Sequence, residues 1–92
     1  MKGKNSYTVF FTLNIDRGKR VYHSYIWALT VEQAAWIFGV NFSKILREDD
    51  LRAWTVAEVG PAGEVSIRNN ESLEKYVYAG LDGSPFGKEA KS

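Results

Sequence analysis

The sequence predicts an α+β domain, in which a small antiparallel sheet in the order ββαβ(β)α carries one long helix across one face and a short C-terminal helix. Two patterns lead to this expectation. Apolar residues alternate with other residues over 6–15, as in a half-buried strand, and recur every three or four residues over 30–46, as in a helix. Turn residues separate the remaining β-rich segments, so neighbouring strands are expected to form hairpins.

The length and composition predict a single folded unit. Ninety-two residues suffice for one domain with a modest core. We expect this domain over residues 1–82 and a flexible tail over 83–92, where Phe86 is the main apolar residue. A content of 45% hydrophobic and 25% charged residues is typical of a folded chain. The net charge of +1 excludes a general attraction to nucleic acid or anionic lipid, so any basic surface must be local.

The absence of cysteine excludes a disulfide scaffold, a thiolate metal site and a cysteine nucleophile. No apolar segment reaches transmembrane length, so no membrane partner is expected. The apolar run over 7–13 is interrupted by threonines and is not followed by the small residues of a signal-peptide cleavage site. We therefore expect a cytoplasmic protein.

The first hairpin joins a strand over 6–15 to a second over 20–28, through a turn at 16–19 that contains Gly18. Its register is ambiguous by one residue, and that choice decides which side chains share a face. The larger apolar set results if the strand pairing places these residues together: Val9, Phe11, Leu13, Val21, His23, Tyr25, Trp27 and Leu29. The opposite face would then carry Phe10, Tyr22 and Ile26 among Thr8, Thr12, Ser24 and Arg20.

The long helix is expected over 30–46. Thr30 can cap its first turn, and Gln33 can complete a capping box by bonding the Thr30 amide. One face of this helix is apolar and is expected to pack on the sheet: Val31, Ala34, Ala35, Phe38, Phe42, Ile45 and Leu46. Trp36, Ile37 and Val40 point the opposite way, so the helix requires a second partner.

The rest of the chain predicts a solvated acidic loop at 47–50, a strand over 51–59, a turn at 60–63 and a short strand over 64–68. Asn69 and Asn70 can cap a short helix over 71–79, which Gly80 would end. Nine residues do not hold a helix alone in water. This helix must therefore dock either on the back of the long helix or on the second face of the sheet.

No pattern in the chain is typical of an active site. His23 is the single histidine, and no nucleophile, paired acid and base, or spaced set of metal ligands accompanies it. The acids at 48–50 lack the spacing of a calcium loop, and Gly80, Gly83 and Gly87 do not form a phosphate loop. We therefore expect a protein without catalysis, metal or cofactor.

The back of the long helix is the first candidate surface. Tryptophan and arginine are enriched at protein interfaces, and both occur in this set: Trp36, Ile37, Val40, Lys44 and Arg47. It favours a small non-enzymatic binding protein, a regulator or inhibitor of bacterial or phage type, whose partner is another protein or a second copy in a homodimer.

The outer sheet face is the alternative, as a module for single-stranded RNA or DNA. Phe10 and Tyr22 could stack bases while Arg17, Lys19 and Arg20 hold phosphates. So few cations predict few phosphate contacts and a shallow salt dependence. The short helix could cover either candidate surface, and the sequence leaves both arrangements open.

Overall fold

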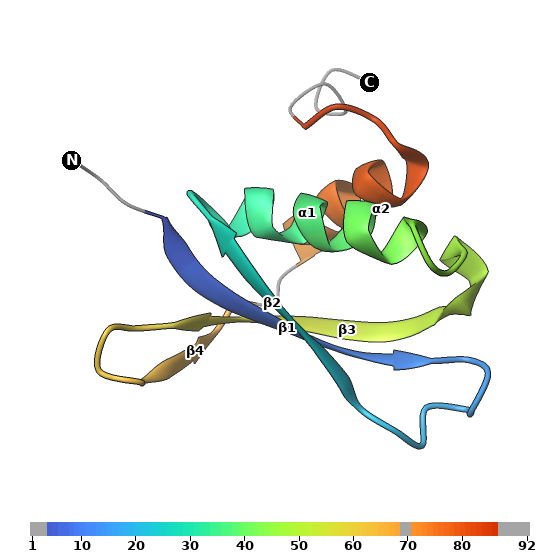
Figure 1. The fold of residues 1–92 in the computed structure, drawn as a ribbon, viewed down its shortest axis with the longest axis horizontal. Helices are drawn as coiled ribbons and strands as arrows, with labels where there is room; N and C mark the ends of the chain where they lie inside the picture. The colour runs from blue at the N-terminus through green and yellow to red at the C-terminus, as the bar shows by residue number, and fades with distance from the viewer. Residues whose placement is uncertain (1–3, 69–70, 87–92) are drawn as a thin grey trace.

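A four-stranded antiparallel sheet and two helices make up the fold in a computed structural model, which describes residues 4–68 and 71–86. The strands are β1 (Asn5–Leu13), β2 (Tyr22–Ala28), β3 (Leu51–Val59) and β4 (Val65–Ile67), in the sheet order β2-β1-β3-β4. The helices are α1 (Val31–Ser43) and α2 (Glu74–Asp82), each near a short 3₁₀ turn, η1 (Glu48–Asp50) and η2 (Glu71–Leu73). Both helices lie on one side of the sheet (Figure 1). The predicted α+β class and element order are confirmed.

The register of the first hairpin is the opposite of the preferred one. Val9 pairs with Ser24 and Phe11 with Tyr22, so Tyr22 and Ile26 lie on the helix side of the sheet. His23, Tyr25 and Trp27 lie on the other side, and the register prediction was wrong. The chain enters α1 only three residues after Ala28, which is fully buried. The strand residue next to the first helical turn must therefore be small. In the predicted register that residue would be Trp27 or Leu29, and both are too large.

The turn between β1 and β2 begins earlier than predicted. β1 ends at Leu13, and the Gly18 amide donates to the Leu13 carbonyl at 2.9 Å and to Asp16 Oδ1 at 3.1 Å. Arg17 and Gly18 both have positive φ, at 60° and 76°. Ile15 consequently lies exposed in the turn and not in the strand.

Helix α1 begins as predicted and ends early. The Gln33 amide donates to Thr30 Oγ1 at 3.1 Å, while Gln33 Oε1 accepts from the Leu29 amide at 2.8 Å and not from the Thr30 amide. At the other end, the amides of Lys44 and Ile45 bond carbonyls three residues back, so the last turn tightens and the α-helix stops at Ser43. Ile45, predicted in the core, is therefore exposed.

The core lies between α1 and the helix side of the sheet. Phe38 is 2% exposed, and its ring lies 5.2 Å from that of Phe11 and 5.7 Å from that of Phe42. The predicted packing of Phe38 and Phe42 on β1 is confirmed. The surrounding buried residues come from every larger element except β4: Tyr7, Val9, Leu13, Ile26, Ala34, Ala35, Val56, Leu73 and Val77.

Strand β3 covers its predicted range and pairs with β1, which places β1 in the middle of the sheet. The turn after β3 closes through the Gly63 amide, which donates to the Gly60 carbonyl at 3.0 Å, with Gly63 at φ 89°. The partner strand β4 is shorter than the predicted 64–68. The predicted helix cap at Asn69 and Asn70 lies outside the described residues.

Helix α2 docks on α1, and two glycines form the crossing point. Gly80 was predicted to end this helix, but it lies buried inside α2, and Gly83 at φ 84° is the C-cap. A Cβ added to Gly39 would clash with the Val77 carbonyl oxygen, and one added to Gly80 would clash with the Trp36 carbonyl oxygen. The helices therefore touch backbone to backbone, a separation that only glycine permits.

Phe38→Ala should lower the free energy of unfolding by roughly 3–5 kcal/mol, because it leaves a cavity beneath α1 in a small core. Urea unfolding followed by circular dichroism measures the change. The exposed Ile45→Ala serves as the control and should change stability by no more than about 0.5 kcal/mol. Equal stability of the two variants would contradict the assigned core.

Gly39→Ala and Gly80→Ala should each destabilise the protein by at least about 2 kcal/mol, because the new methyl group forces the helices apart. Alanine in place of glycine at an unconstrained helical site instead stabilises by about 0.5–1 kcal/mol. The exposed Asn41→Ala in α1 is the matched control and should be neutral or stabilising. A stabilised Gly39→Ala variant would show that the crossing is looser than described.

Candidate functional site

The apolar residues on the back of α1 face α2 and the segment that follows it. The Trp36 indole N–H donates to the Ser84 carbonyl at 2.8 Å, and its ring lies 5.8 Å from that of Phe86. Ile37 packs against the core, and Trp36 and Val40 flank the glycine crossing. These three predicted interface residues are therefore partly buried within the domain.

The two cations of the predicted interface lie apart from this apolar group. Lys44 is the C-cap of α1, and Arg47 follows in the turn, where its amide donates to Asp50 Oδ2 at 2.8 Å. Both side chains are exposed. The structure thus brings together the apolar members of the predicted set but leaves the cations at the helix end.

The residues predicted to bind nucleic acid divide between two faces. Phe10 is on the side away from the helices, whereas Tyr22 is on the helix side, with its ring stacked 5.6 Å from that of Phe11. Arg17, Lys19 and Arg20 are exposed around the turn at one end of the sheet. The register shift therefore removes the predicted aromatic pair from a common surface.

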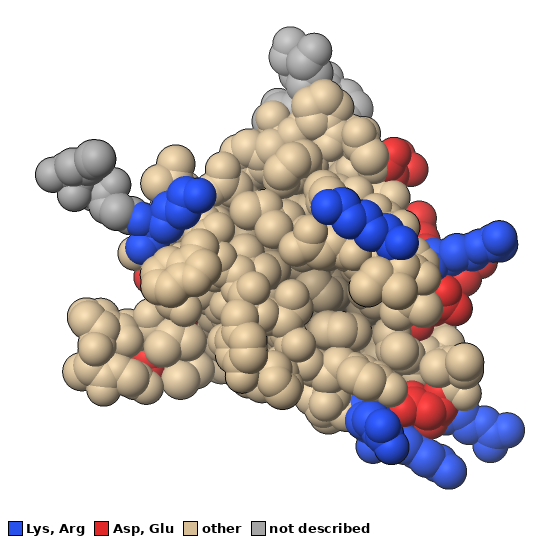
Figure 2. All heavy atoms as spheres, in the orientation of Figure 1, with Lys and Arg blue, Asp and Glu red and all other residues tan. Residues whose placement is uncertain are grey.

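The described helices and strands leave the sheet face away from the helices uncovered, and we call it the open face. Cross-strand pairing assigns its residues: Ser6, Thr8, Phe10 and Thr12 of β1; Val21, His23, Tyr25 and Trp27 in and before β2; Ala53, Thr55, Ala57 and Val59 of β3; Val65 and Ile67 of β4. None of them is Asp, Glu, Lys or Arg. Figure 2 shows the molecule in the orientation of Figure 1, with the sheet below the helices, and most charged side chains lie toward the outline of this view.

The residues of the open face differ in exposure. Tyr25 and Trp27 on β2 are 74% and 64% exposed, and Val65 and Ile67 on β4 are similarly exposed. Between them, Thr8 and Ala57 are covered by their neighbours, at 6% and 0%, whereas Phe10 is exposed. We call Tyr25 and Trp27 the ridge.

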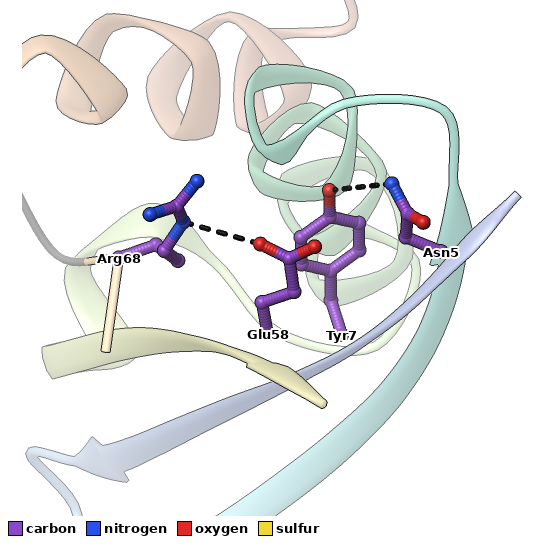
Figure 3. A network of polar contacts seen from close by, with 4 residues as sticks. All are labelled: Asn5, Tyr7, Glu58 and Arg68. Atoms are coloured by element: carbon purple, nitrogen blue, oxygen red, sulfur yellow. Dashed lines mark hydrogen bonds and ion pairs between the residues drawn. The ribbon is translucent and has the colours of Figure 1, made fainter. Parts of the chain in front are cut away.

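The charged and polar side chains that alternate with the open face along the strands point to the helix side. Glu58 accepts from Arg68 Nε at 3.2 Å, and the hydroxyl of Tyr7 accepts from Asn5 Nδ2 at 3.5 Å. Figure 3 shows these four side chains on the side of the sheet where the helices lie. The strands that carry the open face therefore do contain an ion pair, but on their other side.

Strand β2 adds an open edge to this face. It is the first strand in the sheet order, and its seven residues include no charged residue and no proline. Natural sheets usually protect such edges with charges, prolines or bulges. The edge and the open face together form one uncharged surface that includes Tyr25 and Trp27.

The described residues show no arrangement typical of catalysis or metal binding. They contain no group of three or more His, Cys, Asp or Glu side chains that could hold a metal ion. His23 is exposed on the open face, with ring neighbours Phe10 at 6.5 Å and Tyr25 at 5.0 Å. His23 therefore lies among aromatic side chains of the open face.

Sequence reasoning missed Tyr25, Trp27, Val65 and Ile67 as surface residues. The available signal was the alternation in β2 and β4. In the observed register, this alternation places Tyr25 and Trp27 of β2 opposite Thr8 and Ser6 of β1, on the side away from the helices.

No protein-family model, curated protein or solved structure matches this chain. Within residues 4–68 and 71–86, no helix is long and apolar enough to cross a membrane.

Trp36→Glu should lower the free energy of unfolding by about 2–4 kcal/mol, because it removes an aromatic contact and places a carboxylate between α1 and residues 84–86. Asn41→Glu, at an exposed position within the same helix, is the control and should stay within about 0.5 kcal/mol of the parent. Urea unfolding of both variants measures the difference. A fully stable Trp36→Glu protein would show that this tryptophan is dispensable to the fold and would restore the back of α1 as a free surface.

Proposed function

We propose that this protein is a small non-enzymatic binding protein that holds another protein chain on the open face of its sheet. The observation that supports this proposal is the combination of large exposed apolar side chains with a lack of charged residues at the strand positions of that face. Apolar patches of this kind, rimmed by polar residues, typically mark interaction surfaces.

The composition of the open face suits a protein partner. Tyr25 and Trp27 belong to the residue types that dominate binding energy at interfaces, and each presents most of its surface to solvent. No ion has to be desolvated when the face is covered, so the penalty for burying an unpaired charge does not arise. The hydroxyl groups of Thr12 and Thr55, which are partly exposed, can still hydrogen-bond at the interface.

The proposal refines the expectation of a regulator or inhibitor of bacterial or phage type that acts in the cytoplasm. A chain of 92 residues without cysteine suits such a role. Its activity would consist of occupying a surface of the partner, and the exposed ridge would supply the anchor residues.

A single-stranded nucleic-acid module is the second candidate, and one observation favours it. Phe10, His23 and Tyr25 form a series of neighbouring rings on the open face, with centroid separations of 6.5 Å and 5.0 Å. Bases stack on such rings, but proteins that bind single strands also line the path of the phosphates with cations. Arg17, Lys19 and Arg20 lie only at the turn end, so protein binding is the better-supported function.

Photo-crosslinking tests the proposal. A benzophenone amino acid replaces Tyr25 in the full chain, which is expressed in its native host and irradiated. We expect a covalent protein adduct, because the proposed partner covers the ridge. The same amino acid at Ile45, exposed at the end of α1 on the helix side, is the control and should give no adduct of that mass.

The adducts separate the alternatives. Protein adducts that are equally abundant from both positions, or absent from position 25, would contradict binding on the open face. An adduct at position 25 that contains RNA or DNA and no second protein would replace this function with the nucleic-acid alternative.

A further inference from the structure

We propose that the occupant of the open face is a second copy of this chain, and that the protein is a symmetric dimer in which two sheets pack face to face. This inference rests on the proposed function, because it names the partner of the same surface. Three properties of the open face support it: its exposed apolar area, its neutrality and the arrangement of its exposed residues.

The exposed area is sufficient for a dimer at the small end of the stable range. A whole aromatic side chain offers about 150–250 Å², and the exposed parts of the large apolar residues add up to roughly 600 Å² per copy. These residues are Phe10, Val21, Tyr25, Trp27, Val65 and Ile67. A standard interface buries about 800 Å² per partner, so a face-to-face dimer is at the lower end of the stable range.

The neutrality of the open face favours a copy of itself over a charged partner. A partner with acidic or basic residues at its contact surface would find no counter-ion on this face, and burial of its charges would be unfavourable. A second open face is equally uncharged and equally apolar. Two copies therefore meet without like-charge repulsion and without an unpaired ion at the interface.

The arrangement of the exposed residues is self-complementary. Tyr25 and Trp27 of β2 stand at one flank of the open face, and Val65 and Ile67 of β4 stand at the other. A two-fold axis that runs along the strands, between β1 and β3, places β2 of each copy over β4 of the other. Such an interface is isologous, as closed two-fold symmetry requires, and its strands are aligned as in a β-sandwich.

Sedimentation equilibrium of the purified full chain tests the dimer. Over about 1–100 µM, a range that brackets the micromolar dissociation constants of small interfaces, we expect a mass approaching twice 10.4 kDa. Trp27→Glu should raise the dissociation constant about 100-fold or more, because a two-fold interface buries the new carboxylate twice. Tyr25→Lys tests the other ridge residue in the same way, and circular dichroism verifies that both variants fold. Ile45→Glu, away from the open face, is the control and should remain dimeric.

A parent protein that stays monomeric at about 100 µM, well above the expected dissociation constant, would overturn the second copy as occupant. The proposed function would survive that result if position 25 still formed an adduct with a different protein. If the Trp27→Glu and Tyr25→Lys variants fold and remain dimeric, the dimer interface lies elsewhere, such as at the β2 edge, and the face-to-face dimer is wrong. If one variant does not fold, the other decides.

Discussion

The backbone contact between Gly39 and Gly80 determines how the rest of the molecule is arranged. With no Cβ on either residue, α2 approaches α1 closely enough to cover its back, where Trp36 and Val40 would otherwise be exposed. The nine-residue α2 is too short to persist alone and takes its stability from this contact. Once it is bound there, both helices lie on one side of the sheet, and no described element remains to cover the other side.

The uncharged sheet face follows from the same arrangement. In a sheet covered on one side only, the solvent side usually alternates polar residues with the buried ones. Here the positions that alternate with the core are aromatic, β-branched or small, and the ion pair of Glu58 and Arg68 lies on the helix side. The strand positions of this face thus carry no charge and leave an apolar surface exposed to solvent, which is unusual for an isolated soluble domain. This lack of charge is the observation on which the proposed function rests.

Local patterns in the sequence predicted the elements, whereas contacts between distant residues determined the features that were missed. The alternation in β1 and the Thr30 cap identified a strand and the start of α1, because both depend on neighbouring residues. The hairpin register depended on how closely α1 begins above Ala28, which no short segment reveals. Gly80 has the position expected of a helix stop, and only its contact with Gly39 explains why α2 continues through it. The candidate site shifted with these two features, since the register exposed Tyr25 and the helix contact covered Trp36.

The order of elements along the chain has a consequence for synthesis. The sheet and α1 leave the ribosome before α2, so Gly39 is synthesised before its contact partner Gly80 and stays uncovered until α2 emerges. Until then, the nascent chain exposes apolar surface on both sides: the back of α1 and the open face of the sheet. Docking of α2 covers only the first of these. A second chain held near the ribosome, such as one translated from the same messenger RNA, would then find the sheet already formed and its own counterpart within reach.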